Sequence, residues 1–395
     1  MTSFYTKIKH KVVLLIVHLF NLLPVQNNKI FLFSYYGSQF GCNPKYITDY
    51  IINNEPDGKF DIVWAFNDLE SRKHLESFRK VKVMSLKYFY ELCTSKVVIT
   101  NFRTTEYFVK RKNQYYIQTW HSSLRLKQIE KDAESSLPAH YLQMAKKDSQ
   151  KCDLLLSGCK YSSTIFKRAF WYQGEIFEHG IPRNDVLFQN DENKREEVLK
   201  KLNIKKNTKI VLYAPTFRKD HNDHVYNVDY SKVVDSLSRK FGGKWKVLVK
   251  LHPHLLAQSK HLLNGQEVMD VTKYDDIQEL LLVADVLISD YSSLIFDYAI
   301  TNRPCFLFIP DVVEYIKKER NLYFEIDKLP FISGKSNTEL IDQIDNFNSE
   351  DYLLNLRSFL KGIESYENGV AAEKLLEKID TICFGEKRRG LDEAV

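Results

Sequence analysis

The most constraining feature of the sequence is an alternation of short apolar runs with longer stretches of helical periodicity. In the first half the apolar runs cover residues 30–34, 60–66, 97–100, 115–119 and 154–157. Helical periodicity lies between them, for example over residues 43–53. Short buried strands separated by helices are the pattern of a parallel α/β sheet.

The second half repeats this alternation after a polar, charge-rich break at residues 189–207. Its predicted strands cover residues 209–213, 245–251, 268–271, 286–289 and 305–309. Its predicted helices cover residues 193–202, 230–241, 276–284, 294–301 and 351–382. We therefore expect an α/β protein with two Rossmann-like, doubly wound domains, residues 26–205 and 206–395, and a cleft between them. The C-terminal helices are assigned to the second domain.

Residues 1–25 form a separate basic and apolar segment. An apolar run at residues 12–23 follows Lys7, Lys9 and Lys11. The run is too short to span a bilayer, which needs about 20 residues, and no small-residue cleavage site follows it. An N-terminal apolar helix is predicted, with two interpretations left open. It either lies in the membrane interface, anchored by its lysines, or is a buried first helix of the domain.

Composition and missing motifs exclude several classes of protein. The net charge of +6 is a mild excess, unlike the strong basicity of nucleic-acid binders. It suits an anionic substrate or lipid surface, and taken alone it is explained by solubility. The six cysteines lack CxxC or zinc spacing and are interpreted as reduced core residues of a cytosolic protein. Walker A, GxGxxG, Asp-x-Asp and GxSxG patterns are absent from the sequence, so no cofactor or metal ligand is indicated, and whether a divalent cation assists is left open.

One strand end in the second half carries polar side chains suited to a phosphate. The segment VLISDYSSLIFD, residues 286–297, predicts a strand that ends at Asp290, a turn, and a helix that begins at Ser292 or Ser293. A helix N-terminus has free N–H groups and partial positive charge, so it can hold a phosphate. A simple helix cap by one serine is the alternative interpretation.

Two more segments of the second half contain candidate phosphate contacts. Lys250 and His252 lie in VLVKLHPH, where the lysine supplies a point charge and the histidine can hydrogen-bond a diphosphate or assist the leaving group. Thr216 and Arg218 follow the strand in VLYAPTFR and are candidates for contacting phosphate or base. The alternatives are a structural histidine and a surface arginine in a turn.

The first half contains a candidate base and another candidate phosphate partner. His121 follows a strand-like run in QTWHSSLRLK, and the unperturbed pKa of histidine suits general-base work near neutral pH. Arg183 lies in the HGIPRND turn before the domain boundary and is a natural phosphate partner. A hydroxyl that attacks phosphorus needs such a base, so these residues favour transfer of a phosphate-bearing group.

Taken together, five segments resemble, in the same order, the CDP-glycerol glycerophosphotransferase family of teichoic-acid and capsule polymerases. The resemblance covers roughly residues 95–370 and is carried by QTWHSSLRLKQIEKDA, GIPRND, YAPTFR, KLHPH and VLISDYSSLIFDYAITNRPCFLF. It implies a GT-B-like fold in which the second domain holds most of the nucleotide. It also implies that His121 is the catalytic base, and that His252 binds the donor diphosphate together with Asp290 and the serine-rich helix start.

The chain departs from the family pattern at one place. Family members often read Trp-His-Gly-Thr-Pro-Leu-Lys, whereas residues 120–127 read Trp-His-Ser-Ser-Leu-Arg-Leu-Lys, which is one residue longer before the lysine. The variant resembles the branch found in capsule loci. It leaves the acceptor and the polyol open and retains the histidine.

We therefore predict an enzyme that transfers glycerol phosphate from CDP-glycerol to a hydroxyl of a lipid-linked surface polymer, teichoic acid or capsule, and releases CMP. It is expected at an anionic membrane surface, peripherally on the cytoplasmic face of the cell membrane, with no nucleic-acid partner. The predicted site comprises His121 and His252 as catalytic residues, Thr216, Arg218, Lys250, Asp290, Ser292, Ser293 and Asp297 as donor-binding residues, and Ser122, Ser123, Arg183 and Asn184 as supporting residues. Three alternatives stay open: a GT-B glycosyltransferase that uses a CMP-sugar or another nucleotide sugar, a transferase that uses CDP-ribitol, and a non-catalytic polymer-binding scaffold.

Overall fold

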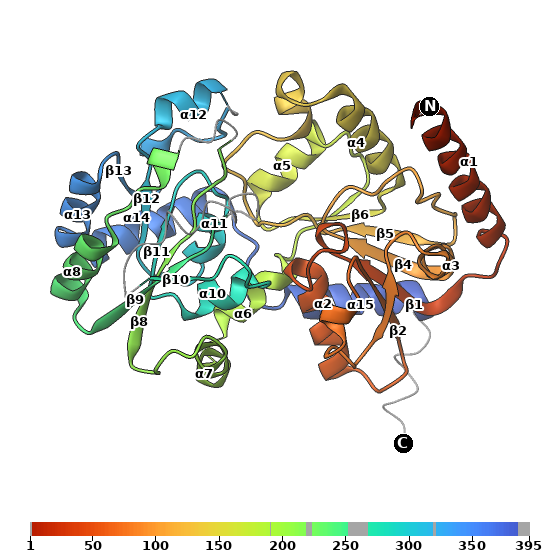
Figure 1. Cartoon of the computed structure of the whole chain (residues 1–395), viewed down its shortest axis with the longest axis horizontal. Helices are drawn as coiled ribbons and strands as arrows, with labels where there is room; N and C mark the ends of the chain where they lie inside the picture. The colour runs from red at the N-terminus through yellow and green to blue at the C-terminus, as the bar shows by residue number, and fades with distance from the viewer. Residues whose placement is uncertain (1, 190, 219–222, 252–267, 319–320, 386–395) are drawn as a thin grey trace.

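The computed structural model describes residues 2–189, 191–218, 223–251, 268–318 and 321–385. Within these residues the chain forms two parallel β-sheets that lie side by side, with helices packed around them (Figure 1). The first sheet has the strand order β3-β2-β1-β4-β5-β6-β7, and the second has the order β10-β9-β8-β11-β12-β13.

The first sheet consists of β1 (Gln26–Phe33), β2 (Asp61–Phe66), β3 (Arg79–Lys82), β4 (Ser95–Thr100), β5 (Tyr115–Gln118), β6 (Leu154–Leu156) and β7 (Glu175–Phe177). The second consists of β8 (Thr208–Tyr213), β9 (Lys244–Val249), β10 (Val268–Asp270), β11 (Val286–Ser289), β12 (Cys305–Phe308) and β13 (Ile332–Gly334). The α-helices are α1 (Thr2–Phe20), α2 (Cys42–Asn54), α3 (Leu86–Thr94), α4 (Ala139–Lys151), α5 (Lys160–Ala169), α6 (Asp185–Phe188), α7 (Glu192–Lys201), α8 (Tyr230–Phe241), α10 (Ile277–Val283), α11 (Leu294–Ala299), α12 (Val312–Lys318), α13 (Asn337–Asp345), α14 (Ser349–Gly362) and α15 (Ala371–Phe384).

In each sheet the strand order runs outward in both directions from one central strand, so that the direction of strand addition reverses beside it. β1 lies between β2 and β4, and β8 lies between β9 and β11, with parallel pairing throughout. In open parallel sheets, ligands bind beyond the carboxyl ends of the strands at such switch points. We therefore expect the site in the segments that follow the central strands.

Both faces of the first sheet are covered, because side chains alternate along each buried strand. In β1, Ile30 and Leu32 pack in a core with α2 and α15, whereas Phe31 and Phe33 pack in a core with α1 and α3. The six cysteines are free thiols, and all but Cys152 are buried, in agreement with the prediction that they are core residues.

The predicted α/β class with two parallel sheets is confirmed. Each strand predicted from the apolar runs is present, but β3, β7 and β13 were not predicted. These three are edge strands, and their sequences RKVK, EIF and ISG are short and only partly buried. An edge strand has one partner and often one covered face, so it lacks the continuous apolar run on which the prediction relied.

The C-terminal helices are divided between the two sheets, which differs from the predicted domain layout. α14 packs in the core of the second sheet through Tyr352 and Leu356. The chain then crosses over residues 363–370, and α15 packs against the first sheet through Leu375 and Ile379. Apolar spacing identifies a helix but does not say which sheet it covers. The boundary predicted near residue 205 stays a prediction.

Helix α1 has one covered apolar face and one exposed apolar face. Val13 and Val17 are buried in the core that α1 shares with α3. Leu15 and Leu19 are exposed on the helix, with 60% and 56% of their surfaces accessible, and Leu22, which follows the end of the helix, is 82% exposed. In the part of the chain that the structure describes, no helix has both the length and the apolarity needed to cross a membrane.

Candidate active site

His121 lies three residues beyond β5, at the carboxyl edge of the first sheet. The preceding residue, Trp120, has a φ of +51°, a left-handed conformation that is uncommon for a bulky side chain. The Trp120 carbonyl accepts a hydrogen bond of 3.1 Å from the Asn43 amide. The imidazole stacks on Trp120, with ring centroids 4.7 Å apart, and on Phe102 at 5.7 Å. Backbone strain of this kind clusters at functional sites, and here it accompanies a fixed ring orientation.

The electrostatic surroundings of His121 keep its ring neutral. Its pKa is lowered to about 3, first by burial and then by the positive charges of Arg125 and Arg183, while the Asn101 backbone acts in the opposite direction. Among the described residues, the buried Nδ1 atom of His121 has no hydrogen-bond partner. The ring is therefore neutral, and the same positive charges that oppose its protonation favour a bound anion beside it.

Four of the predicted site residues meet in one buried node between the two sheets. The carboxylate of Asp297, on α11, accepts hydrogen bonds from the Arg183 guanidinium and from the Asn184 amide, the latter at 3.3 Å. It also accepts bonds from the backbone N–H and the hydroxyl of Ser123, both at 3.3 Å. Asp297 is fully buried and Arg183 is 4% exposed. These hydrogen bonds therefore connect the first half of the chain to α11 in the second half. The predicted contacts of these residues with a donor stay predictions.

The neighbouring serines of the first half are also held inside the protein. The Ser122 carbonyl accepts a 2.9 Å hydrogen bond from the Arg125 guanidinium. The Ser122 hydroxyl is buried and has no hydrogen-bond partner among the described residues. Both serines thus belong to the short loop that carries His121, which makes this loop the link between the histidine and the node at Asp297.

The predicted serine-rich helix start exists, but its hydroxyls are used differently. α11 begins at Leu294, with Ser293 as the N-cap residue, and the Ser293 side chain caps none of the helix N–H groups. Its hydroxyl instead accepts a 3.3 Å hydrogen bond from the backbone N–H of Leu126, in the first half. Ser292 accepts from the Leu294 N–H at 3.3 Å. Ser293 is a second link between α11 and the loop that follows His121.

Asp290 organises the turn after β8. Its carboxylate accepts the backbone N–H of Thr216 at 2.9 and 3.0 Å and pairs with Arg218 at 2.9 Å. Arg218 also donates to Asp311 at 2.7 Å, and its guanidinium packs on the ring of Tyr291. Two carboxylates therefore neutralise one arginine, which reduces what Arg218 can offer to an anion. The buried Thr216 hydroxyl, in contrast, has no partner among the described residues.

Lys250 also has internal partners. Its ammonium donates to the backbone carbonyls of Thr272 and Tyr274, at 3.0 and 2.7 Å. Burial lowers its pKa to about 8, and nearby acidic groups counteract this only in part. His252, the second predicted catalytic histidine, lies outside the described residues.

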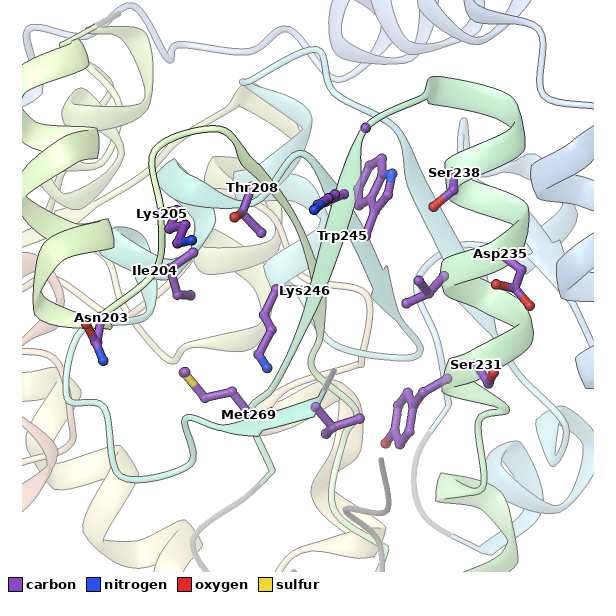
Figure 2. A pocket seen from close by; sticks show the side chains of 15 residues that line it. Asn203, Ile204, Lys205, Thr208, Ser231, Asp235, Ser238, Trp245, Lys246 and Met269 are labelled. Carbon is purple, nitrogen blue, oxygen red and sulfur yellow. The ribbon is translucent and has the colours of Figure 1, made fainter. Parts of the chain in front are cut away.

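A large pocket lies away from these residues, between α8 and the second sheet (Figure 2). Its volume is about 780 Å³, and its lining includes Thr208, Lys244 and Val268, which begin strands β8, β9 and β10. The amino ends of parallel strands lie at the edge opposite to the one where ligands of such sheets bind. The pocket is therefore not part of the candidate site.

Two charged residues near the site were not predicted from the sequence. Arg125 is 3% exposed, packs on Phe166 and makes no ion pair with a carboxylate among the described residues. Burial lowers its pKa to about 9. Glu367 accepts a 3.0 Å hydrogen bond from Asn184. Arg125 lies four residues after His121, a proximity that could have identified it, whereas nothing in the local sequence marks Glu367.

Two doubly wound sheets, joined by a buried polar node and carrying a neutral histidine at the carboxyl edge, define a GT-B-like transferase. A model of the family described as CDP-Glycerol:Poly(glycerophosphate) glycerophosphotransferase matches residues 15–381. The chain belongs to this family, as the sequence resemblance had indicated.

The chain is similar to curated relatives and to solved structures. It is 31% identical to the teichoic acid poly(glycerol phosphate) polymerase of Bacillus spizizenii, over 95% of this chain and 98% of the relative. It is 29% identical to the teichoic acid glycerol-phosphate transferase of Staphylococcus aureus, over 91% and 95% of the two chains. The wall teichoic acid polymerase TagF, in a variant soaked with CDPG, superposes with a TM-score of 0.82 at 28% identity, over 97% of this chain and 98% of that one. The chain spans only 49% of the polymerase of Bacillus subtilis.

Proposed function

We propose that this chain transfers glycerol phosphate from CDP-glycerol to a hydroxyl of a lipid-linked teichoic acid or capsule polymer and releases CMP. The observation that carries the proposal is the match to the glycerophosphotransferase family over residues 15–381. The similarity to TagF and to the glycerol-phosphate transferases supports the same donor.

In the proposed reaction, the acceptor oxygen forms a bond to the phosphorus that bears glycerol. The bond from that phosphorus to the bridging oxygen breaks, and CMP leaves with the electron pair. His121 takes the proton of the attacking hydroxyl, because its Nδ1 is unpartnered among the described residues. The negative charge of the donor phosphates raises its lowered pKa toward the neutral range, where a general base works. The positive charge of Arg125, which makes no ion pair among the described residues, acts on the same region and stabilises the negative charge of the phosphates.

A substitution at His121 tests its role. The variant His121→Asn should lower turnover by about 100-fold or more, which is the usual contribution of a general base, while the donor still binds. His140→Asn is the matched control, because His140 is an exposed histidine on α4. Near-wild-type turnover of His121→Asn would refute the assignment of His121 as the base.

We also propose that α1 places the enzyme on the cytoplasmic surface of the membrane. Its exposed apolar residues recur at spacings of three and four and so form one stripe: Ile8, Val12, Leu15 and Leu19. Lys9 and Lys11 are exposed beside the stripe and suit an anionic lipid surface. Since Val13 and Val17 pack in the core at the same time, the two interpretations of this helix are compatible.

Vesicle sedimentation tests the membrane proposal. Leu15→Glu and Leu19→Glu together should release the protein from anionic vesicles without unfolding it, because both side chains are exposed. Deletion of the helix is a poorer test, since it would also remove Val13 and Val17 from the core. Leu354→Glu is the control, because this leucine of α14 is 68% exposed and lies elsewhere. Unchanged sedimentation of the α1 variant would contradict the proposal.

A further inference from the structure

The connection between α14 and α15 is bonded to the loop that follows β6. The backbone N–H of Lys160 donates to the Glu364 carbonyl at 3.0 Å, and the N–H of Tyr366 donates to the Gly158 carbonyl at 2.9 Å. An isolated bridge pairs Cys159 with Ser365. Because α14 packs in the second core and α15 in the first, this connection passes from one half of the protein to the other.

Glu367 extends from this connection toward the turn that precedes α6. Its carboxyl accepts a hydrogen bond from the Asn184 amide at 3.0 Å and one from the Ile181 backbone N–H at 3.3 Å. A Cβ atom added at Gly158 would lie 2.6 Å from one Glu367 oxygen, and one added at Gly180 would lie 3.0 Å from the other. Two glycines thus leave the space that the carboxyl fills. Burial, followed by the nearby charge of Asp297, raises the pKa of Glu367 well above its usual range.

Asn184 connects Glu367 to the node at Asp297. Its amide N–H₂ donates both to Glu367 and to Asp297, at 3.0 and 3.3 Å. Its carbonyl oxygen accepts a 2.7 Å hydrogen bond from Gln278, on α10. The Asn184 side chain is therefore fixed on both sides, and it is fully buried. A buried amide whose hydrogen bonds are all made has a single orientation. A displacement of one partner therefore displaces the amide and, with it, the other partners.

Asp297 in turn holds the loop that carries His121. It accepts the N–H and the hydroxyl of Ser123, two residues after the histidine. The path from Glu367 through Asn184 and Asp297 to Ser123 is a continuous series of hydrogen bonds between side chains and backbone. The imidazole of His121 stacks on Trp120 and Phe102. Among the described residues, it makes no hydrogen bond or ring contact with the members of this path.

We propose that Glu367 is a positioning residue that, through Asn184 and Asp297, sets the place of the His121 loop relative to the donor-side helix α11. This inference rests on the proposed function, in which His121 is the base. A small displacement of a catalytic group can cost about 100-fold in rate, so loss of Glu367 should act on turnover.

Kinetics of two variants test this role. Glu367→Ala should lower kcat by about 10- to 100-fold and leave the KM for CDP-glycerol within about twofold, because the donor itself is not contacted. Glu367→Gln should lie between Glu367→Ala and the unmodified enzyme, since it keeps the volume and one hydrogen-bond acceptor. Glu364→Gln, an exposed residue of the same connection, is the control and should leave both constants unchanged. Losses confined to KM, or equal effects of Glu367→Ala and Glu364→Gln, would overturn the proposal.

Hydrogen exchange tests the same coupling without any activity. In Glu367→Ala, backbone amides of residues 121–126 should exchange at least about fivefold faster, while the strands of both sheets keep their protection. Unchanged exchange in this loop would overturn the positioning role even if the enzyme is active. Faster exchange in a protein that releases no CMP from any donor would retain the coupling and refute the proposed function, so the two failures are distinguishable.

Discussion

Arg183 and Asp297 form a buried ion pair between the two halves of the protein. The guanidinium of Arg183, in the turn before α6, donates to the carboxylate of Asp297 on α11, and the two side chains are 4% and 0% exposed. Burial alone would lower the pKa of Arg183. The nearby charge of Asp297 outweighs burial, so the pKa lies above its usual range. The pair lies where the loop of His121 meets the second sheet, so it couples stability to the geometry of the candidate site.

Breaking this pair should destabilise the protein strongly. Arg183→Met leaves the Asp297 carboxylate buried without its counter-ion and should lower the free energy of unfolding by about 3–5 kcal/mol. The double variant Arg183→Met with Asp297→Leu should lose less than Arg183→Met alone, because no unpaired charge remains. Urea unfolding of the three proteins checks this. A double variant that is less stable than Arg183→Met would contradict the ion-pair account.

The stability of the protein should fall in acid partly because of His121. Its pKa is about 3 in the folded protein against an ordinary value of 6.5, so between these pH values the unfolded chain binds more protons than the folded one. The stabilisation is present above about pH 6.5 and is lost as the pH falls toward 3. The free energy of unfolding of His121→Asn should therefore depend less on pH over this interval. Parallel curves for His121→Asn and the unmodified protein would contradict the burial of a neutral ring, and His140→Asn serves as the control.

Gly158 should not tolerate a side chain. A Cβ atom there would lie 2.3 Å from the Ser123 Cβ and 2.5 Å from its Cα, a backbone atom that cannot rotate away. Gly158→Ala should therefore displace the His121 loop and lower CMP release by about 10-fold or more. Gly362→Ala is the matched control, because nothing lies within 4 Å of a Cβ at that position. Equal CMP release by the two variants would show that the close approach of Gly158 to Ser123 does not affect activity.

We expect the Thr216 hydroxyl to hydrogen-bond the donor and to contribute little to the stability of the fold. It is buried, and among the described residues it has no hydrogen-bond partner, so Thr216→Val removes no hydrogen bond within that part of the chain. We expect an unchanged melting temperature and a KM for CDP-glycerol raised about 10-fold, which is the loss of one hydrogen bond to a charged group. A KM unchanged by Thr216→Val would remove Thr216 from the donor site. Thr381→Val, an exposed threonine of α15, is the control.

Much of the fold could be predicted from the sequence, since buried strands such as β4 and β11 are continuous apolar runs. The edge strands β3, β7 and β13 could not, because they lack this signal. The packing of α15 on the first sheet was also not predictable from its periodicity. Both failures concern long-range packing, which a local pattern does not encode.

The structure brings several segments of the predicted site together, and the roles of their residues stay predictions. The segments around His121, Arg183 and Asp297 do come together. Their chemistry suggested direct phosphate contacts, yet Asp297 and Arg183 bind each other, and Arg218 binds Asp290 and Asp311. A charged side chain at a strand end has the same sequence signature whether its counter-ion is a ligand or another residue. Only tertiary contacts distinguish the two.

The central claim is tested most directly by CMP release from the purified chain, offered CDP-glycerol, CDP-ribitol and a CMP-sugar in parallel, with and without a lipid-linked acceptor analogue. The account predicts release from CDP-glycerol that depends on the acceptor and is lost in His121→Asn. Release from CDP-ribitol or the CMP-sugar alone would contradict the proposed donor, and no release from any donor would contradict catalysis itself.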